Sequence, residues 1–412
     1  MAYQNRGPDY FRRKLAGKRS RVLLRYKFYE MKNVALDFGI STPPALRAWN
    51  SALGWCAKAV DSLADRLVFR EFRNDLFQVN EIFRVNNPDI FFDSSVLSAL
   101  IASCCFVYIT PDEDGFPRLQ VIDGGNATGA IDPITGLLNE GYAVLSRDEY
   151  GKPKTEAWLT SEKTVYYEDG RKVRTDWQQA GYPLLVPIIY RPDAVRPFGH
   201  SRISRACMST TGSAIRTIKR SEISAEFYSY PQKWVTGLSQ DADKLEKWKA
   251  TMSSLLSFSV DENGENNIHL GQFSQQSMEP HLAQLKMFAS QFAGETGMTI
   301  DDLGFPSDNP SSAEAIKAAH DNLRLTARKA QRCFGSGLLN VAFLAARLRD
   351  DFQYRRQEFA NTVPIWEPVF EPDATSLSLI GDGAIKINQA VPGYIGPETL
   401  HDLTGIRPGD NA

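Results

Sequence analysis

Turn signals recur at short intervals between residues 106 and 190, and they set the strongest constraint on the fold. The sequences PDEDG, DGG, DPITG, DEYG and YEDG separate short runs such as RLQVI, YAVLS, EAWLT and TVYY. Short runs rich in β-branched and aromatic residues, joined by Asp- and Gly-rich turns, are typical of antiparallel strands. The next segment, GYPLLVPIIYRPD, carries Pro183 and Pro187, which lack the amide N–H that a central strand needs. The sequence therefore predicts an antiparallel β region that closes in an edge or irregular segment.

Helical patterns lie on both sides of this β region. Residues 43–69 place apolar side chains at helical spacing, and a second helix is expected to begin near Asp93, with Ser94 or Ser95 near its cap. Beyond the β region, residues 201–230 and 278–298 are predicted to be helices that flank an insertion of about fifty residues, which holds a charged helix near 241–249. Residues 299–310 disfavour regular structure, whereas a long helix could extend over 311–350. The sequence predicts an α+β fold.

The balance of charges argues against a protein whose whole surface attracts and binds nucleic acid. Lys and Arg number 47 against 49 Asp and Glu, so the formal net charge is −2. Basic residues are nevertheless concentrated near the N-terminus, where apolar residues interleave with them at near-helical spacing. We interpret this run as a solvated helix face, and contact with nucleic acid or an acidic partner is the alternative. The basic residues are Arg12, Arg13, Lys14, Lys18, Arg19, Arg21, Arg25 and Lys27, and the apolar ones are Leu15, Val22, Leu23, Tyr26 and Phe28.

Cysteine spacing and hydropathy predict a protein of the cytosol. The five cysteines have no repeated spacing and mostly lie in apolar stretches, so we expect buried, reduced thiols. The longest apolar stretch, residues 96–109, is too short to cross a bilayer and is interrupted by serines. We expect neither a membrane segment nor a signal peptide.

No enzyme motif stands out. There is no phosphate-binding GxxxxGK[ST] loop, and the histidines have no metal-binding spacing. Asp301, Asp302, Asp308 and Glu314 could hold a divalent cation, but loop solubility and helix capping explain them as well, with Ser311 or Ser312 as the cap and Glu314 in a capping box. In RPFGHSRIS, Ser201 is interpreted as a helix N-cap and not as a nucleophile. We expect no catalytic residue, cofactor or metal.

Two long motifs resemble the portal proteins of tailed bacteriophages, which form the ring at one capsid vertex through which DNA is packaged and ejected. The first is FGHSRISRACMSTTGSAIRTIKRSEISAEFYSYPQKWVTG, and the second is GMTIDDLGFPSDNPSSAEAIKAAHDNLRLTARKAQRCFGSGL, in which NPSSAEAI is the most specific part. The resemblance extends from about Pro43 to the stretch DGAIKINQAVPGYIGPETLHDLTGI.

This resemblance implies a portal-like anatomy for the chain. Residues 1–197 would form an N-terminal wing of helices and antiparallel strands, 198–230 and 278–298 two stem helices, and 231–277 the clip. Residues 299–310 would be a tunnel loop, 311–375 a long wing helix with a return strand, and 376–412 a C-terminal region with a small or absent crown.

The resemblance also assigns candidate functional residues. The tunnel loop contains Thr299, Asp301, Asp302, Gly304, Phe305, Pro306, Asp308, Asn309 and Pro310. Arg216, Lys219 and Arg220 are candidates to face the channel, and pairing with Glu222, Glu226 or a neighbouring subunit's acids is their alternative role. In the clip, Trp234, Lys244, Lys247, Trp248 and Lys249 are candidates for docking a motor or connector.

The implied function is structural, with no enzymatic activity. The expected partners are other copies of the chain in a ring of about twelve, the packaging motor (terminase), a head–tail adaptor, the major capsid protein and the double-stranded DNA in the channel. The expected location is the portal vertex of the virion, with the host cytoplasm during assembly and no membrane. The alternative is a metal-dependent DNA-processing enzyme that uses Asp301, Asp302 and Glu314.

Overall fold

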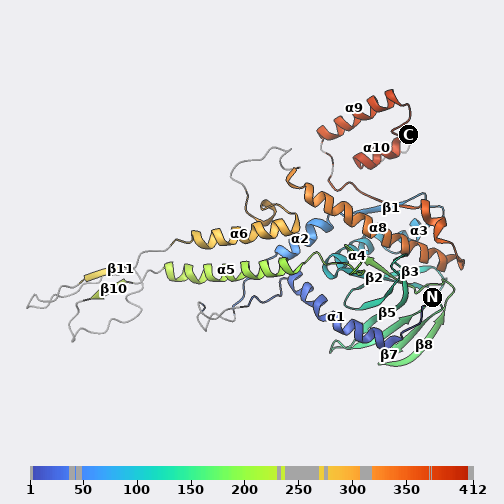
Figure 1. The fold of residues 1–412 in the computed structure, drawn as a ribbon, viewed down its shortest axis with the longest axis horizontal. Coiled ribbons are helices and arrows are strands. Elements are labelled where there is room, and N and C mark those ends of the chain that lie inside the picture. Colours follow the sequence, from blue (N-terminus) through green and yellow to red (C-terminus); the bar gives the residue numbers. More distant parts are fainter. Residues whose placement is uncertain are drawn as a thin grey trace, which may run out of the picture. The chain divides into compact units, whose positions relative to one another are not determined.

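The computed structural model describes residues 3–36, 42, 49–229, 233–236, 269–272, 277–306, 318–370, 372 and 374–406. The chain divides into two compact units. The first unit comprises Met1–Asn33, Gly54–Met208 and Ala293–Ala412, and the second comprises Val34–Leu53 and Ser209–Phe292. Both units combine helices with strands, which confirms the predicted α+β class (Figure 1).

The first unit contains the predicted antiparallel β region. One sheet has five strands in the order β4-β5-β6-β7-β8, and a second has three in the order β3-β2-β9. All neighbouring strands in both sheets are antiparallel. The strands are β2 (Cys104–Pro111), β3 (Pro117–Asp123), β4 (Ala127–Ile131), β5 (Leu138–Arg147), β6 (Pro153–Leu159), β7 (Lys163–Glu168), β8 (Arg171–Trp177) and β9 (Leu185–Ile189).

Aspartates in the turns explain why the turn signals were reliable. Asp112 Oδ1 accepts hydrogen bonds from the backbone N–H of Asp114 (3.1 Å) and Phe116 (2.7 Å). Asp148 Oδ1 does the same for Tyr150 (3.0 Å) and Lys152 (2.7 Å). A short carboxylate that binds the backbone two residues onward fixes a turn locally, without tertiary partners.

The proline-containing segment forms an edge strand, as predicted. Among the described residues, β9 pairs only with β2, and Pro187 lies opposite Phe106 in that register. An edge position leaves one side of the strand without a ladder, so the missing N–H of Pro187 breaks no central pairing.

Helices cover the sheets of the first unit and enclose its core. α4 (Pro88–Ala102) packs on β2 and β3, and α8 (Asp321–Asp350) packs on β9. The core side chains Leu100, Val107, Ile188 and Phe334 are each at most 1% exposed. α1 (Pro8–Tyr29) buries Phe11 and Leu15 against Tyr142 and Val144 of β5. The helix predicted within the basic N-terminal run is therefore confirmed.

A single buried carboxylate holds the segment that precedes α1. Glu140 of β5 is 0% exposed. Its oxygens accept hydrogen bonds from Tyr3 Oη (3.1 Å), from the backbone N–H groups of Arg6 (2.8 Å) and Gly7 (2.9 Å), and from Trp158 Nε1 (2.7 Å). A buried carboxylate is stable only when its lone pairs are satisfied, and these donors satisfy them.

The predicted helix over residues 43–69 is wrong in its extent. Only α2 (Trp55–Ala64) is helical there, residues 49–53 have no regular structure, and 43–48 lie outside the described residues. Phe69 already begins β1 (Phe69–Arg73), which pairs with β12 (Val363–Trp366). Because that partner lies almost three hundred residues onward, local periodicity could not reveal this strand.

The helix expected to begin near Asp93 begins earlier. α4 starts at Pro88, directly after Asn87 in a left-handed conformation, because proline is well suited to the first helical turn. Ser94 and Ser95 are inside the helix, where their hydroxyls donate to the carbonyls of Phe91 (3.2 Å) and Phe92 (2.9 Å). A further short helix, α3 (Val79–Val85), was not predicted.

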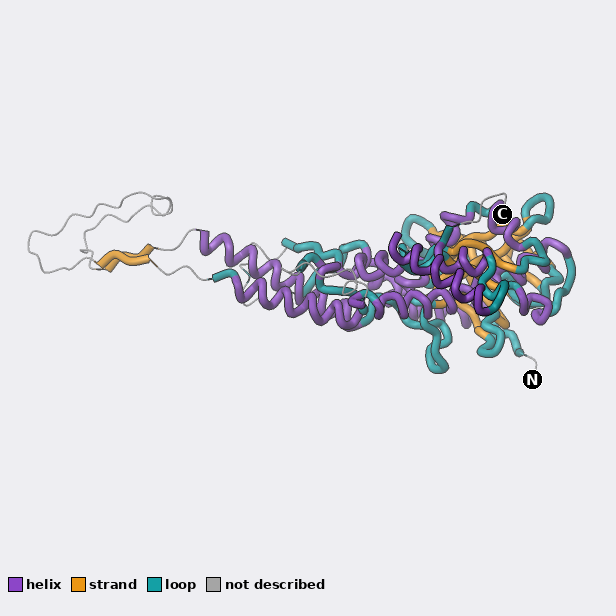
Figure 2. Tube along the Cα trace, turned by 90° about the horizontal axis from the view of Figure 1, so that it is seen from above, coloured by secondary structure: helices purple, strands orange, loops and turns teal. Residues whose placement is uncertain are grey.

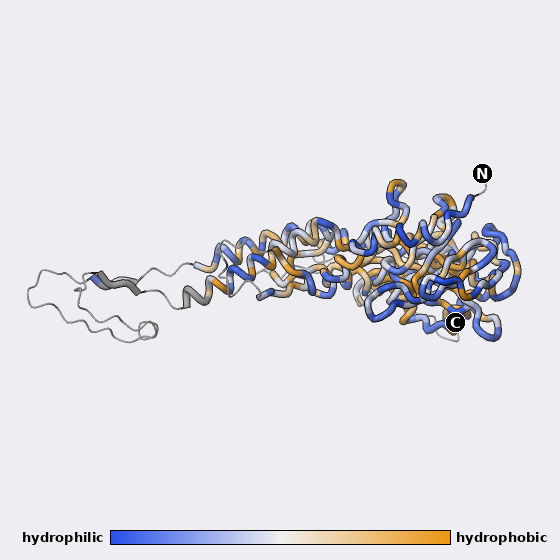
Figure 3. The backbone as a smooth tube through the Cα atoms, turned by 90° about the horizontal axis from the view of Figure 1, so that it is seen from below, coloured by the Kyte–Doolittle hydropathy of each residue, from blue (hydrophilic) through white to orange (hydrophobic). Residues whose placement is uncertain are grey.

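The two helices predicted over residues 201–230 and 278–298 are present as α5 (Arg205–Ser229) and α6 (Glu279–Thr296). They run side by side (Figures 1 and 2), and within the second unit Thr217 Oγ1 donates to Gln284 Oε1 at 3.0 Å. Hydrophilic and hydrophobic residues alternate along both helices (Figure 3), as expected for helices with one packed face.

In the insertion between α5 and α6, β10 (Lys233–Thr236) pairs with β11 (His269–Gln272). The helix predicted near 241–249 lies outside the described residues.

The long helix predicted over residues 311–350 is found in its larger, C-terminal part, and residues 311–317 lie outside the described residues. α8 starts at Asp321, Ala318 and Ala319 are also helical, and the turn at His320 interrupts the continuous helix expected over 311–350. The proposed caps Ser311 and Ser312 and the capping-box residue Glu314 lie outside the described residues.

The C-terminal region forms α9 (Ala374–Ala390) and α10 (Pro397–Thr404). Asp402 of α10 accepts a 2.7 Å hydrogen bond from Arg73 Nη2.

Candidate functional site

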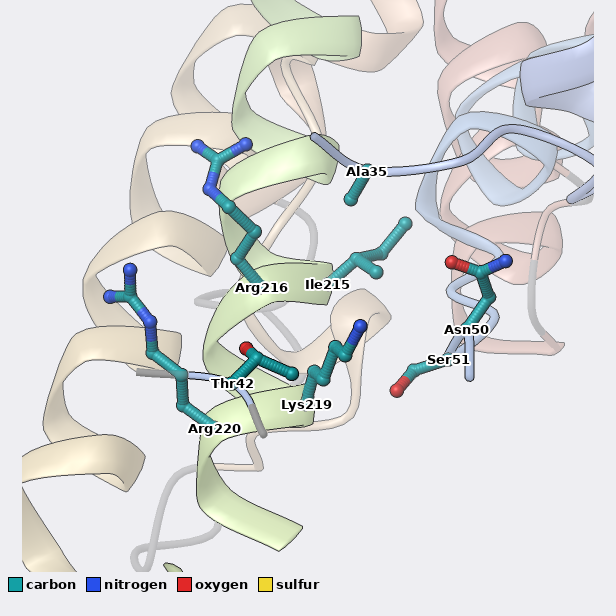
Figure 4. A pocket seen from close by; sticks show the side chains of 8 residues that line it. All are labelled: Ala35, Thr42, Asn50, Ser51, Ile215, Arg216, Lys219 and Arg220. Atoms are coloured by element: carbon teal, nitrogen blue, oxygen red, sulfur yellow. The ribbon is translucent and has the colours of Figure 1, made fainter. Parts of the chain in front are cut away.

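The basic residues predicted to face a channel lie on different sides of α5. Arg216 and Arg220 extend from one side of the helix, whereas Lys219 extends with Ile215 toward Asn50 and Ser51 (Figure 4). Lys219 is 8% exposed, and Arg216 Nη2 donates to Ser213 Oγ at 2.8 Å. Burial, followed by the charge of Arg220, lowers the pKa of Arg216. Only Arg216 and Arg220 thus share one helix face, and their orientation toward a channel stays a prediction.

The cavity beside these residues is too small for a ligand. It measures about 10 Å³, which is room for about one water molecule. Its lining comes entirely from the second unit, and Ser51 Oγ is buried there with no hydrogen-bond partner among the described residues. The lining residues are Ala35, Thr42, Asn50, Ser51, Ile215, Arg216, Lys219 and Arg220.

The start of the predicted tunnel loop folds into a short turn. Asp301–Leu303 form a single 3-10 turn that ends at Gly304, whose φ is +90°. Asp302 Oδ2 accepts from the Thr299 N–H at 2.9 Å, and Thr299 Oγ1 accepts from the Asp302 N–H at 3.2 Å. This reciprocal pair gives Asp302 a backbone-capping role. Phe305 and Pro306 follow the turn, and Asp308, Asn309 and Pro310 lie outside the described residues.

The geometry of Ser201 corrects one prediction. Ser201 is not the cap of α5, which begins four residues later. Its Oγ donates to the Ile101 carbonyl at 2.6 Å and accepts from the Ile203 N–H at 3.0 Å, so it fixes the loop before the helix. Ser204 Oγ accepts from the Cys207 N–H at 3.1 Å and is the actual cap. The neighbouring His200 is engaged elsewhere, because its Nε2 lies 2.6 Å from Asp193 Oδ2 at the surface.

Arg202 was missed by the sequence analysis and is a structural anchor of the first unit. Its side chain is 7% exposed, Nε donates to the Ala59 carbonyl (3.2 Å), and Nη2 donates to the Thr296 carbonyl (2.6 Å). Thr296 is the last residue of α6, where a cation is favoured by the helix dipole. The sequence alone contains no signal that distinguishes this buried arginine from the exposed arginines near it in the chain.

The remaining predicted residues receive only partial descriptions. Trp234 lies in β10, whereas Lys244, Lys247, Trp248 and Lys249 lie outside the described residues. Across the described segments, no group of three or more His, Cys, Asp or Glu side chains could hold a metal ion. Glu314 is outside these segments, so the constellation of Asp301, Asp302 and Glu314 is not described.

The sequence also led to expectations about the cysteine thiols and about how apolar the helices are. All five cysteines are free, and Cys56, Cys104, Cys105 and Cys207 are buried, while Cys333 is partly exposed. No helix in the described parts of the chain has both the length and the apolar character needed to cross a bilayer.

Sequence comparison finds two curated relatives over most of the chain. The portal protein of Mycobacterium phage D29 is 24% identical over 344 residues, which are 78% of this chain and 70% of that protein. The portal protein of Mycobacterium phage L5 is 23% identical over the same length and shares. No protein-family model matches the chain.

Comparison with solved structures finds necks of gene transfer agent (GTA) particles. The neck of an empty GTA particle, computed with C6 symmetry, is 14% identical, with 90% of this chain and 95% of that chain covered and a TM-score of 0.48. The neck of the native GTA particle, computed with C12 symmetry, is 15% identical, with 95% and 99% covered and a TM-score of 0.48. The resemblance predicted from the two long motifs is confirmed by the curated relatives, and this chain is related in sequence to phage portal proteins.

Proposed function

We propose that this chain is the subunit of a portal ring, the channel at one capsid vertex through which phage DNA is packaged and ejected. The observation that carries the proposal is the match to two portal proteins over 78% of the chain and 70% of their length. Alignment over most of both chains favours a shared role for the whole protein and not for one borrowed module. The chain would then reside in the virion, after assembly in the host cytoplasm.

The structure supplies elements that suit this role. α5 and α6 are a pair of long helices joined through an insertion, which fits a stem that leads into a clip. Residues 299–310 connect α6 to the region before α8, which fits a loop that projects into the channel. The clip residues Trp234, Lys244, Lys247, Trp248 and Lys249 would meet the packaging motor and the head–tail adaptor, and the wing would meet the major capsid protein.

The near-neutral charge of the chain also suits a channel for moving DNA. Each phosphate that a protein neutralises strengthens a salt-dependent hold on the duplex. A formal net charge of −2 on 412 residues keeps that hold weak, so DNA can slide. Arg216 and Arg220 would add a limited attraction on one face of α5.

We expect the purified full-length protein to form closed rings. Head-to-tail contacts between identical chains close into a ring, and the family resemblance implies about twelve subunits in the virion. Light scattering should therefore give the mass of a large closed oligomer, whose subunit number in isolation can differ from that in the virion, and negative-stain images should show a central hole. A monomer or a two-fold dimer at micromolar concentration would contradict the proposal.

The tunnel-loop acids separate the portal role from the alternative of a metal-dependent enzyme. In an Asp301→Asn/Asp302→Asn variant, the amide oxygen introduced at position 302 can still accept from the Thr299 N–H, so the turn should persist and DNA packaging should stay within about two-fold of wild type. Deletion of residues 304–308 should instead leave rings intact and reduce packaging or DNA retention. Loss of packaging in the double variant, with the deletion tolerated, would favour the enzyme.

A further inference from the structure

Among the residues that the structure describes, a cavity beside α1 in the first unit is lined by five cationic side chains and by no carboxylate. It measures about 430 Å³, within the size range of small-molecule sites. The cations come from α1 and from the loop before α5, and the remaining wall is apolar or uncharged and includes the rings of Phe106 and Phe198. The cationic lining residues are Lys14, Lys18, Arg21, Arg25 and Arg196.

The residues that the structure describes neutralise these cations poorly. Lys14 Nζ donates to the Gly129 carbonyl at 2.6 Å, and Lys18 Nζ lies 5.2 Å from the centroid of the Phe198 ring. Arg25 Nε is buried and has no hydrogen-bond partner among the residues that the structure describes. A buried donor without an acceptor is costly, so the Arg25 guanidinium, which also lines the cavity, would gain from a ligand that brings an acceptor to it.

The acidic groups near the cavity do not supply that ligand. Asp123 is engaged with its own turn, accepting from the Gly125 N–H at 2.6 Å and from Asn126 Nδ2 at 2.5 Å. Burial raises the pKa of Cys104 to about 11, so its thiol carries no charge near neutral pH. Arg12, on the same helix, provides the contrast, because it forms a 2.5 Å ion pair with Glu156.

The pKa values of Lys14, Lys18 and Arg25 reflect the same imbalance of charge. Burial, followed by the charge of Lys18, lowers the pKa of Lys14 to about 8. Burial also lowers the pKa of Lys18, and burial followed by the charges of Arg21 and Arg196 lowers the pKa of Arg25. An anion in the cavity would favour the charged form of each group.

We propose that this cavity is a binding site for a polyvalent oxyanion of the phosphate class. One carboxylate would balance only one of the cations, whereas a polyphosphate balances several and offers many acceptor oxygens to lysine and arginine. The phosphoryl group could belong to a free small anion or to a nucleic-acid strand. The role proposed above for the portal does not use this site, so each proposal can fail alone.

Calorimetric titration of the full-length protein with sodium tripolyphosphate tests the site. We expect saturable binding that weakens as salt rises. Lys18→Gln and Arg25→Gln should each weaken binding by about tenfold or more, because each removes a cation from the lining. Lys27→Gln and Arg13→Gln, exposed positions on the same helix that do not line the cavity, should change affinity by less than about two-fold.

Competing ligands identify the source of the phosphoryl group. Displacement of tripolyphosphate by a short single-stranded DNA would assign a nucleic-acid strand, and failure of the DNA to compete would assign a small anion. Either result supports the site. Tighter binding of a short polyglutamate peptide than of tripolyphosphate would overturn the phosphate class, and equal losses in the control variants would overturn the location.

Thermal unfolding keeps the proposal falsifiable if a variant does not fold. Tripolyphosphate should raise the melting temperature of the wild-type protein, because a ligand that binds only the folded state stabilises it. If tripolyphosphate does not change the melting temperature of the wild-type protein, the proposal is overturned whether or not Arg25→Gln folds.

Discussion

Gly199→Ala is expected to lower the free energy of unfolding by more than about 3 kcal/mol. Gly199 has a φ of +72°, a left-handed conformation that L residues adopt only with strain. A Cβ at this position would lie 2.0 Å from the Tyr190 carbonyl oxygen and 2.8 Å from Ile189 Cγ2. The carbonyl cannot easily retreat, because it accepts a 3.0 Å hydrogen bond from the His200 N–H.

Gly170→Ala is the matched control for this variant. Gly170 has a φ of +79°, and a Cβ there would meet nothing within 4 Å. This substitution isolates the conformational strain, which we expect to be about 1 kcal/mol. Urea unfolding of both variants measures the difference between strain alone and strain with a steric clash. Similar losses in the two proteins would show that the loop around Gly199 relaxes.

Glu156→Leu should destabilise the first unit by about 3 kcal/mol or more. Glu156 is 3% exposed and accepts from Arg12 Nε at 3.1 Å, from Arg12 Nη2 at 2.5 Å and from the Tyr142 hydroxyl. Burial, followed by the hydrogen bond to Glu156, raises the pKa of Tyr142. Removing the carboxylate would leave the Tyr142 hydroxyl and the Nε and Nη2 groups of Arg12 without this acceptor, while Arg12 Nη1 keeps its 2.8 Å hydrogen bond to Asp9 Oδ1.

A double-mutant cycle distinguishes the ion pair from packing. Arg12→Met/Glu156→Leu should be more stable than the sum of its single variants predicts, since both partners are then replaced by apolar groups. Glu168→Leu, at an exposed position on the neighbouring strand β7, should change stability by less than about 0.5 kcal/mol. Additive effects of Arg12→Met and Glu156→Leu would rule out a coupled pair.

The parts of the fold that could be predicted are those whose signals are local. The turns at Asp112 and Asp148 are fixed by hydrogen bonds within four residues, so the strands around them were found. The helices α5 and α6 were predicted from the sequence pattern, with boundaries displaced by a few residues. The pairing of β1 with β12 was missed, because its two strands are separated by most of the chain.

The candidate sites show the same contrast between features set by nearby residues and features set by residues far along the chain. Arg12 and Lys18 look alike in the sequence, yet one has a buried carboxylate partner and the other faces a cavity without one. Glu156 lies 144 residues from Arg12. The N-terminal run alone could therefore predict neither the ion pair of Arg12 with Glu156 nor the cavity whose cationic lining lacks a carboxylate. The capping role of Asp302 is local, but no feature of the sequence favours it over Asp301 for that role.

The buried carboxylate of Glu140 has a consequence for the order in which the chain folds during synthesis. Tyr3, Arg6 and Gly7 leave the ribosome well before their acceptor, which lies 133 to 137 residues onward. At typical elongation rates of about 5–20 residues per second, these donors wait on the order of ten seconds for β5 to be made. Residues translated early thus reach their native partner late, and the segment before α1 can be fixed in place only once β5 has been made.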